Sequence, residues 1–328
     1  MIPSYQIKID QKELAPDITG RIQSITVSDE EGMESDSISI DFEDSDGNLA
    51  LPKRGVRVEV AMGYVGKISP VGAFIVDEVE LETGRLSVSG KGFDTDKSLK
   101  TMKTRSFKAK KLADVIKKIS EENGLQAKVA PDFSATVFAK ELVQQNESDL
   151  NLLTRLAKSH NAVFKIQGST LLFALKNSGK TGSGQDLPEV EINVSSEISW
   201  NVIFSGRSEY RKVIAKVYDI DTGESIEVVA GEPKGFPVLV LPGQYTDREI
   251  AEKEVQSRLS GQGYQSAVLS LTMPAPKDEV IGVSTPINLK GARNGVDGTW
   301  IVSKTSRTIN TTNYVQTLEC VKKQKGSS

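Results

Sequence analysis

The run Gly179-Lys180-Thr181 ends in the way that a phosphate-binding loop ends. Such a loop has a further glycine five residues before the Gly-Lys pair, so that backbone amides can wrap the phosphates, and a helix follows. Here that earlier position is Ala174, and the residues that follow are rich in glycine and serine. We therefore interpret the run as part of a linker rather than as a nucleotide site.

A second run, Asp44-Ser45-Asp46-Gly47-Asn48, begins like a calcium-binding loop. The EF-hand loop needs its glycine at the sixth position and a bidentate glutamate at the twelfth. In this run the glycine stands at the fourth position and the twelfth is Gly55, so we predict a hairpin turn. The same interpretation applies to Asp219, Asp221 and Gly223.

The chain has one histidine, His160, and one cysteine, Cys320. This inventory excludes a disulfide framework and leaves almost no zinc chemistry, because zinc sites gather several such ligands. A Ser-His-Asp triad of the hydrolase kind would need a Gly-x-Ser-x-Gly turn, which the sequence lacks. We interpret His160 as a structural or surface residue and Cys320 as a small core residue.

Five lysines form the one basic cluster of the sequence: Lys108, Lys110, Lys111, Lys117 and Lys118. Lysines on the outer face of an amphipathic helix usually serve solvation. Contact with an acidic partner surface is the alternative.

Paired carboxylates could hydrolyse sugars if two of them faced each other across a cleft, one in an apolar setting. Acidic pairs such as Asp77-Glu78 and Glu121-Glu122 are present, but their spacing is not distinctive. The residues thus give no catalytic set, and we expect no enzyme, no cofactor and no metal.

Composition narrows the class further. The 328 residues carry 41 basic and 44 acidic side chains, a net charge of −3, spread along the chain. Nucleic-acid binders usually show a basic stripe, so we do not expect nucleic-acid recognition. The chain has no apolar run long enough to cross a bilayer and no secretory signal pattern at its start. We therefore expect folding in a cytoplasm and no stable membrane insertion.

The elements that would carry these residues change character along the chain. Up to about residue 97, alternation of period two predicts consecutive short strands: Ile38, Ile40 and Phe42 alternate with Ser37, Ser39 and Asp41. Turn residues separate these strands and no helical crossover interrupts them, which favours an antiparallel sandwich or barrel.

The middle of the chain has a helical period. Leu112, Val115, Ile116 and Ile119 predict a helix over about 109–122 that ends at Asn123-Gly124. A second helix is predicted over about 149–160, capped by Asn146 or Ser148, and strand follows over 162–176.

The Gly/Ser-rich segment 177–190 is predicted to be a linker with nothing to bury. Beyond it, strands are expected over 192–200, 211–218, 238–241, 267–273, 300–304 and 314–321. One helix is expected after the capping box that starts at Thr246. The predicted domains are 1–97 (N-terminal, barrel-like), 98–176 (α/β insert), 177–190 (linker) and 191–328 (C-terminal, barrel-like). The fold class is β-rich α+β, with two barrel-like antiparallel β-domains and a small α/β insert.

Several segments, in order along nearly the whole chain, resemble one family. The most specific segment contains Gln145, Glu147, Ser148, Asp149 and Leu150, followed by Arg155 and Leu156; the family shows Gln-x-x-Glu-Ser-Asp-Leu and then Arg-Leu. Residues 27–40, 51–64, 72–77 and 291–302 fit its hairpins, although a histidine that the family often carries after the last is absent. This is the phage late control protein D family, the tail hub proteins of contractile phages, related to the hub part of type VI secretion VgrG spike proteins.

The resemblance implies a baseplate hub in the virion tail. Three chains would form a ring of pseudo-sixfold symmetry that joins the tail tube protein to a central spike protein, among other baseplate subunits. Closed cyclic association gives edge strands a partner. Because the chain ends in a polar tail, we expect the spike to be a separate polypeptide.

Two other functions remain as alternatives. A tail-tip peptidoglycan hydrolase would clear a cell-wall suspension and would leave a cleared band in a zymogram. A module that binds host-surface glycans would use exposed aromatic side chains, but aromatic residues make up only 6% of the chain, with Trp200 and Trp300 the two tryptophans.

Overall fold

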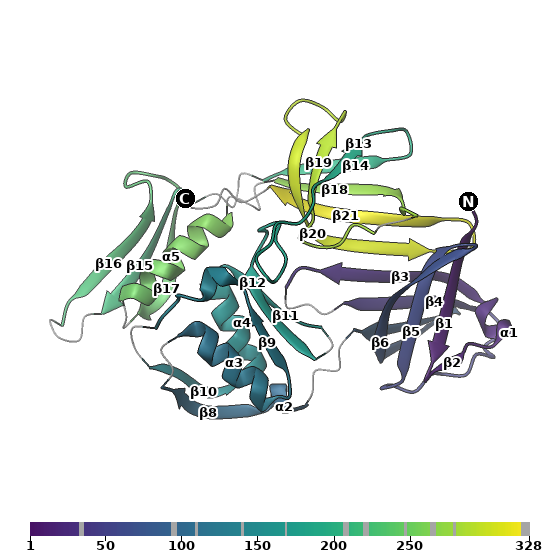
Figure 1. Ribbon diagram of the computed structural model, residues 1–328, viewed down its shortest axis with the longest axis horizontal. Helices are drawn as coiled ribbons and strands as arrows, with labels where there is room; N and C mark the ends of the chain where they lie inside the picture. The colour runs from purple at the N-terminus through teal and green to yellow at the C-terminus, as the bar shows by residue number, and fades with distance from the viewer. Residues whose placement is uncertain are drawn as a thin grey trace.

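The computed structural model describes residues 1–32, 36–92, 97–108, 111–138, 141–167, 169–205, 210–218, 223–245, 248–262, 267–277 and 280–322. Strands dominate these residues and most pair antiparallel, which confirms the predicted β-rich class. Figure 1 shows a long sheet, an α/β insert beside it, and a small sheet that carries one helix.

The long sheet has 13 strands. Its main path runs β14-β18-β21-β20-β3-β4-β7-β6-β5-β1-β2, and β13 joins through β19, which pairs with β20. The N-terminal region contributes β1 (Pro3–Ile9), β2 (Lys12–Glu13), the short helix α1 (Pro16–Thr19), β3 (Ile22–Glu30), β4 (Ser37–Asp44), β5 (Arg57–Tyr64), β6 (Lys67–Glu82) and β7 (Gly84–Lys91). The C-terminal region contributes β13 (Val190–Asn193), β14 (Ser199–Phe204), β18 (Ala267–Pro274), β19 (Pro286–Lys290), β20 (Gly298–Ile309) and β21 (Tyr314–Lys322).

One antiparallel pairing joins the two regions into this single sheet. β20 lies beside β3, with Lys304 opposite Glu30 at one end and Ile309 opposite Ile25 at the other. The hydroxyls of Thr26 and Thr308 are 3.0 Å apart across the junction. The two predicted β-regions therefore lie side by side as one hydrogen-bonded layer.

The insert contains α2 (Lys97–Lys100), β8 (Met102–Phe107), α3 (Leu112–Glu122), β9 (Gln126–Val129), the 3-10 turn η1 (Pro131–Phe133), β10 (Leu142–Ser148), α4 (Asp149–Ser159), β11 (Ala162–Gln167) and β12 (Thr170–Leu175). β8 pairs with β10, and β12 lies between β11 and β9. Both predicted helices are present, and Gly124 follows α3 with the left-handed φ of +67°.

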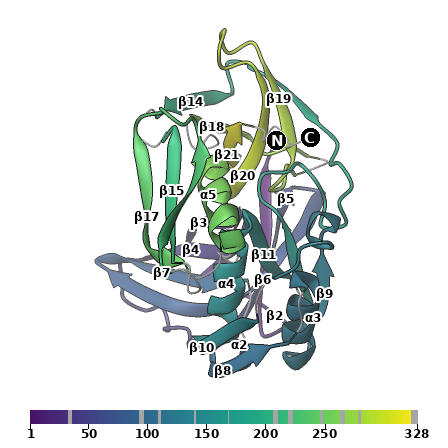
Figure 2. The ribbon, with the colours of Figure 1, turned by 90° about the vertical axis from the view of Figure 1, so that its left-hand side faces the viewer.

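A third unit consists of β15 (Lys212–Tyr218), β16 (Ser225–Gly231), β17 (Val238–Tyr245) and α5 (Arg248–Gln262). Figure 2 shows α5 against its sheet and next to α4 of the insert. The start of the capping box predicted for this helix, Thr246 and Asp247, lies outside the described residues.

Buried apolar side chains form four clusters. The first lies under the N-terminal strands and includes Ile309 and Tyr314 from the C-terminal region. The second fills the insert, the third surrounds Trp300, and the fourth lies between α5 and the small sheet. The residues 191–328 thus contribute two separate cores, while the domain boundaries stay a prediction.

Two segments differ from their predicted conformation. The predicted strand over 192–200 is two strands, β13 and β14, because a turn closed by Ile198 N and Ser195 O separates them. The linker over 177–190 folds back on itself, with Leu187 N donating to Gly179 O. Gly179 lies close to Pro286 and is buried, so the segment buries more than its composition predicts.

A buried carboxylate network and the candidate functional site

The family-like segment forms the junction between β10 and α4. Ser148 precedes the helix with extended backbone, and its Oγ accepts a hydrogen bond of 3.1 Å from Asn151 N. Of the two cap candidates, Ser148 is therefore the one that satisfies an orphan amide of the helix. Asn146 instead has a φ of +46° at an irregularity of β10.

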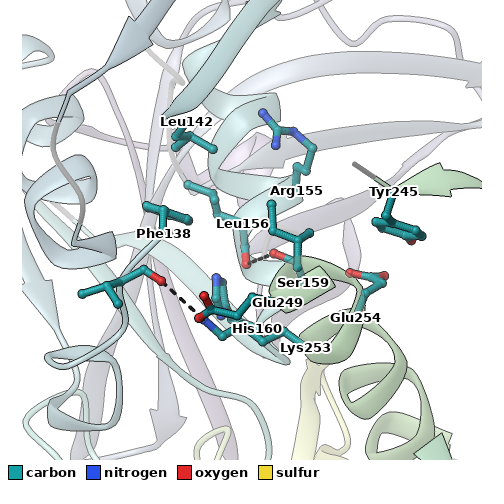
Figure 3. Close-up of a pocket in the computed structure, with 12 residues that line it drawn as sticks. Phe138, Leu142, Arg155, Leu156, Ser159, His160, Tyr245, Glu249, Lys253 and Glu254 are labelled. Atoms are coloured by element: carbon teal, nitrogen blue, oxygen red, sulfur yellow. Dashed lines mark hydrogen bonds and ion pairs between the residues drawn. The ribbon is translucent and has the colours of Figure 1, made fainter. Parts of the chain in front are cut away.

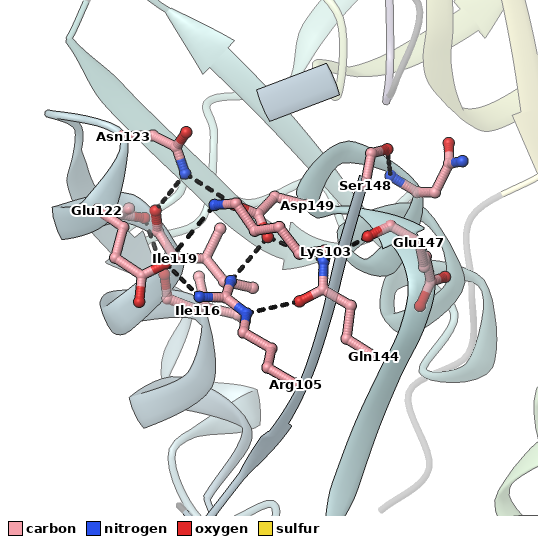
Figure 4. Close-up of polar contacts among 12 residues, drawn as sticks. Lys103, Arg105, Ile116, Ile119, Glu122, Asn123, Gln144, Glu147, Ser148 and Asp149 are labelled. Atoms are coloured by element: carbon pink, nitrogen blue, oxygen red, sulfur yellow. Dashed lines mark hydrogen bonds and ion pairs between the residues drawn. The ribbon is translucent and has the colours of Figure 1, made fainter. Parts of the chain in front are cut away.

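Asp149, the first residue of α4, is 0% exposed and accepts four hydrogen bonds (Figure 4). The donors are Lys103 Nζ at 2.6 Å, Arg105 Nη2 at 2.7 Å, Gln144 Nε2 at 3.0 Å and Asn123 Nδ2 at 3.1 Å. Burial alone would raise the pKa of Asp149, but these hydrogen bonds and the nearby cations outweigh it and lower the pKa. The carboxylate is thus held ionised, with its acceptor capacity used.

Arg105 extends this network. Its guanidinium donates to Gln144 Oε1 at 2.7 Å, pairs with Glu122, and lies 4.6 Å from the centre of the Phe107 ring. Glu122 ends α3, so the network ties that helix end to the start of α4. Planar guanidinium groups suit such bidentate and stacked geometry.

The remaining motif residues pack around this start. Glu147 accepts from Arg155 Nε at 3.1 Å and Nη2 at 2.8 Å. Leu156 is buried in the insert core, and Leu150 is partly buried against it. Gln145 is exposed on β10, whereas its neighbour Gln144 is the glutamine that reaches Asp149.

Sequence reasoning missed four members of the network: Lys103, Arg105, Asn123 and Gln144. Two signals could have found some of them. The family spacing Gln-x-x-Glu, counted back from Glu147, gives Gln144, and the alternation of β8 places Lys103 and Arg105 on one face. Both oxygens of Asp149 are occupied by these hydrogen bonds, so the carboxylate is not available as a nucleophile or a base. We therefore assign the network a structural role.

A cavity of about 350 Å³ lies between α4 and α5 (Figure 3). His160 lies in it, with its ring edge-on to Phe133 and Phe138. Burial, and then the charge of Lys253, lower the pKa of His160 to about 4. Lys253 Nζ donates to Glu249 Oε1 at 2.7 Å, and Ser159 Oγ donates to Leu156 O at 3.0 Å, so neither is poised as a nucleophile with the histidine.

The other residues that the sequence analysis considered either have structural contacts or lie outside the described residues. Asp46 binds Arg21 in the predicted turn, at 2.6 and 2.7 Å. Cys320 is buried, and burial raises the pKa of its thiol. Asp219 and Asp221 lie outside the described residues, as does Lys110 of the basic cluster. Across the residues that the structure describes, no three histidine, cysteine or acidic side chains are placed to hold a metal ion.

Comparison with known proteins assigns the chain to a protein family. The family model for the phage tail baseplate hub (GPD) matches residues 42–313. The chain belongs to this family. It is a baseplate hub protein, as the resemblance predicted, and its place is the tail of a phage virion. The family is one of structural baseplate proteins rather than of enzymes.

Two phage relatives share this description. The "Probable baseplate hub protein" of Escherichia phage P2 is 31% identical over 219 residues, which are 66% of this chain and 56% of the P2 protein's own length. The corresponding protein of Escherichia phage 186 is 23% identical over an alignment that covers 97% of this chain and 92% of that protein.

Solved structures show the same fold at low identity. The 43 kDa tail protein of prophage MuSo2 from Shewanella oneidensis has a TM-score of 0.72 at 14% identity and covers 98% of each chain. The E. coli c3393 protein, a component of the type VI secretion system, has a TM-score of 0.58 at 10% identity, over 97% of this hub protein and 77% of that chain. Among the described residues of the hub protein, no helix is long and apolar enough to span a membrane.

Proposed function

We propose that this hub protein forms a homotrimeric ring that joins the tail tube of a contractile phage tail to its central spike. The observation that supports this best is the edge strand β14. Its inner edge pairs with β18, and no described strand pairs with its outer edge. At its end, Ile203 and Phe204 are 63% and 62% exposed.

An open edge that also carries apolar side chains is a liability for an isolated chain. The chain already closes one such edge internally, where β20 pairs with β3 and joins its two β-regions. A cyclic trimer would repeat this solution between subunits, since each copy offers the same edge to the next. The pseudo-sixfold ring that the resemblance implies would then contact the tube on one face and the spike on the other.

The first test is the mass of the purified protein by light scattering, alone and with the spike protein of the same tail. We expect a trimer in at least one condition. Phe204→Lys places a charge on the open edge, and we expect it to lower the association constant for trimer formation at least about tenfold, the change that about 1.4 kcal/mol produces.

Val143→Lys is the matched control, because Val143 is also more than half exposed, at 53%, and lies on β10 of the insert, away from this edge. We expect it to assemble like the wild type. A stable dimer, or a monomer that ignores the spike, would refute the ring. A trimer that Phe204→Lys leaves intact would refute the β14 interface.

A further inference from the structure

Glu31 lies where three parts of the chain meet. It follows the end of β3, which points toward the insert in Figure 1. Its side chain contacts Asn177, just after β12 of the insert, and Ser284, just before β19 of the C-terminal region. One carboxyl group thus connects the N-terminal region, the insert and the C-terminal region.

The contacts at this junction are short and direct. Glu31 Oε1 accepts from Ser284 Oγ at 2.7 Å and from Asn177 N at 3.0 Å. The Glu31 backbone amide donates to Ser303 O at 2.8 Å. Close by, Lys165 of β11 donates to both Asp29 and Asp36 at 2.6 Å, which ties the insert to the same end of the long sheet.

Both partners of the carboxyl hold an unusual backbone conformation. Asn177 has a φ of +51° and Ser284 a φ of +63°. Residues other than glycine adopt this region at an energetic cost, which the surrounding contacts must offset. The backbone is therefore bent at both places in a way that brings these groups to Glu31.

Two buried oxygens at this junction lack a hydrogen-bond donor. Glu31 Oε2 and Asn177 Oδ1 are both without a partner, and Asn177 is 6% exposed. Two acceptors of this kind cannot bond to each other unless one carries a proton. Leaving each unpaired would cost the desolvation energy of the group, which is largest for a carboxylate.

Burial raises the pKa of Glu31, and this effect outweighs the hydrogen bonds from Ser284 and Asn177 and the charge of Lys176, which lower it. The neighbouring Asp29 adds a like charge, which also favours the neutral carboxyl.

We propose that Glu31 is protonated in the folded protein and donates from Oε2 to Asn177 Oδ1, as a latch that holds the insert against the long sheet. A single proton satisfies both unpaired oxygens. Ionisation would send that proton to solvent, leave a buried carboxylate beside Asp29, and remove the bond to Asn177. The latch concerns the arrangement within one chain and does not depend on the ring.

The direction with pH follows from the raised pKa of Glu31 in the folded state. The stabilisation is fully present below the ordinary carboxyl pKa and is lost as the pH rises through the folded value. Burial, and then the like charge of Asp36, also raise the pKa of Asp29, to about 6, so Asp29 adds a pH dependence of the same sign. A variant that changes Glu31 alone is therefore needed to separate its pH dependence from that of Asp29.

Lys176 directly precedes Asn177, and Lys180 lies three residues after it. Because trypsin cleaves after lysine only where the backbone opens, cleavage at these two bonds reports opening of this junction. Glu31→Gln is the matched variant, because its amide donates to Asn177 Oδ1 at every pH while its oxygen still accepts. We expect the ratio of wild-type to Glu31→Gln cleavage rates to rise with pH from the ordinary carboxyl pKa up to the folded pKa of Glu31, and to level off above it. Between the ordinary and the folded pKa of Glu31 the rise should approach about tenfold per pH unit. Taking the ratio at each pH removes the protease's own pH dependence.

Asn177→Gly removes the side-chain acceptor together with the rest of the carboxamide, while glycine keeps the positive φ without strain. We expect it to be cleaved faster than the wild type at the low end of this range. Fragment masses identify the cleaved bond. A wild-type to Glu31→Gln ratio that stays constant with pH would overturn the latch, and so would wild-type cleavage rates in Asn177→Gly.

Discussion

Asp149 concentrates the interactions of the insert on one side chain. Its two oxygens accept bonds from a lysine, an arginine and two amides, which arrive from β8, β10 and the end of α3. A buried ion pair contributes little net stability relative to apolar packing, but removal of one partner is costly because the others lose theirs.

Asp149→Ala would leave Lys103 and Arg105 without their buried anion. We expect it to lower the free energy of unfolding by about 2–4 kcal/mol, measured by urea denaturation. Asp132→Ala is the surface control, since Asp132 is exposed in η1. Equal midpoints for the two variants would contradict the role given to the network.

His160 supplies a pH dependence of the opposite kind to that of Glu31. Burial and Lys253 lower its pKa to about 4 in the folded protein, against an ordinary value of 6.5. The unfolded chain therefore binds the proton more readily, and stability is lost as the pH falls from above 6.5 toward 4. We expect this loss to reach about 2–3 kcal/mol. It should be absent from His160→Gln, and thermal unfolding of both proteins over that range measures it.

At the scale of elements, α4 is specified by local chemistry. Ser148 caps its first turn and buried leucines line one face. Ser148→Ala removes the cap, and we expect a loss of about 1 kcal/mol in unfolding free energy. Ser225→Ala, on the exposed strand β16, should change it by less than about 0.5 kcal/mol. Urea midpoints of the two variants give the comparison, and similar losses would show that the cap contributes no more than an exposed serine.

At the scale of the molecule, the β20–β3 pairing should make the two β-regions unfold together. Ile25 is fully buried in the N-terminal core, whereas Trp200 and Trp300 both pack in the C-terminal core. We expect Ile25→Ala to cost about 2–4 kcal/mol and to lower the tryptophan-fluorescence midpoint as far as the circular-dichroism midpoint.

Leu153→Ala gives the comparison within the insert, whose strands share no described pairing with the long sheet. There we expect the tryptophan midpoint to move less than the circular-dichroism midpoint. Separate transitions in Ile25→Ala would mean that the long sheet is not one cooperative unit.

The sequence by itself determined the features that depend on neighbours along the chain. Alternation and helical period located most strands and both insert helices, Asn146 and Ser148 stood out as the two cap candidates, and the ordered motifs indicated the hub family.

Only the tertiary structure decided which distant groups meet. In the structure Gln144, rather than Gln145, donates to Asp149, and Lys103 and Arg105 contact the same carboxylate. Strand β3 pairs with β20, and Asn177 and Ser284 both contact Glu31. The reason is physical: side-chain period is local, but strand register and packing between remote segments are set by the free energy of the whole chain. Those contacts fix how the insert and the two β-regions are joined.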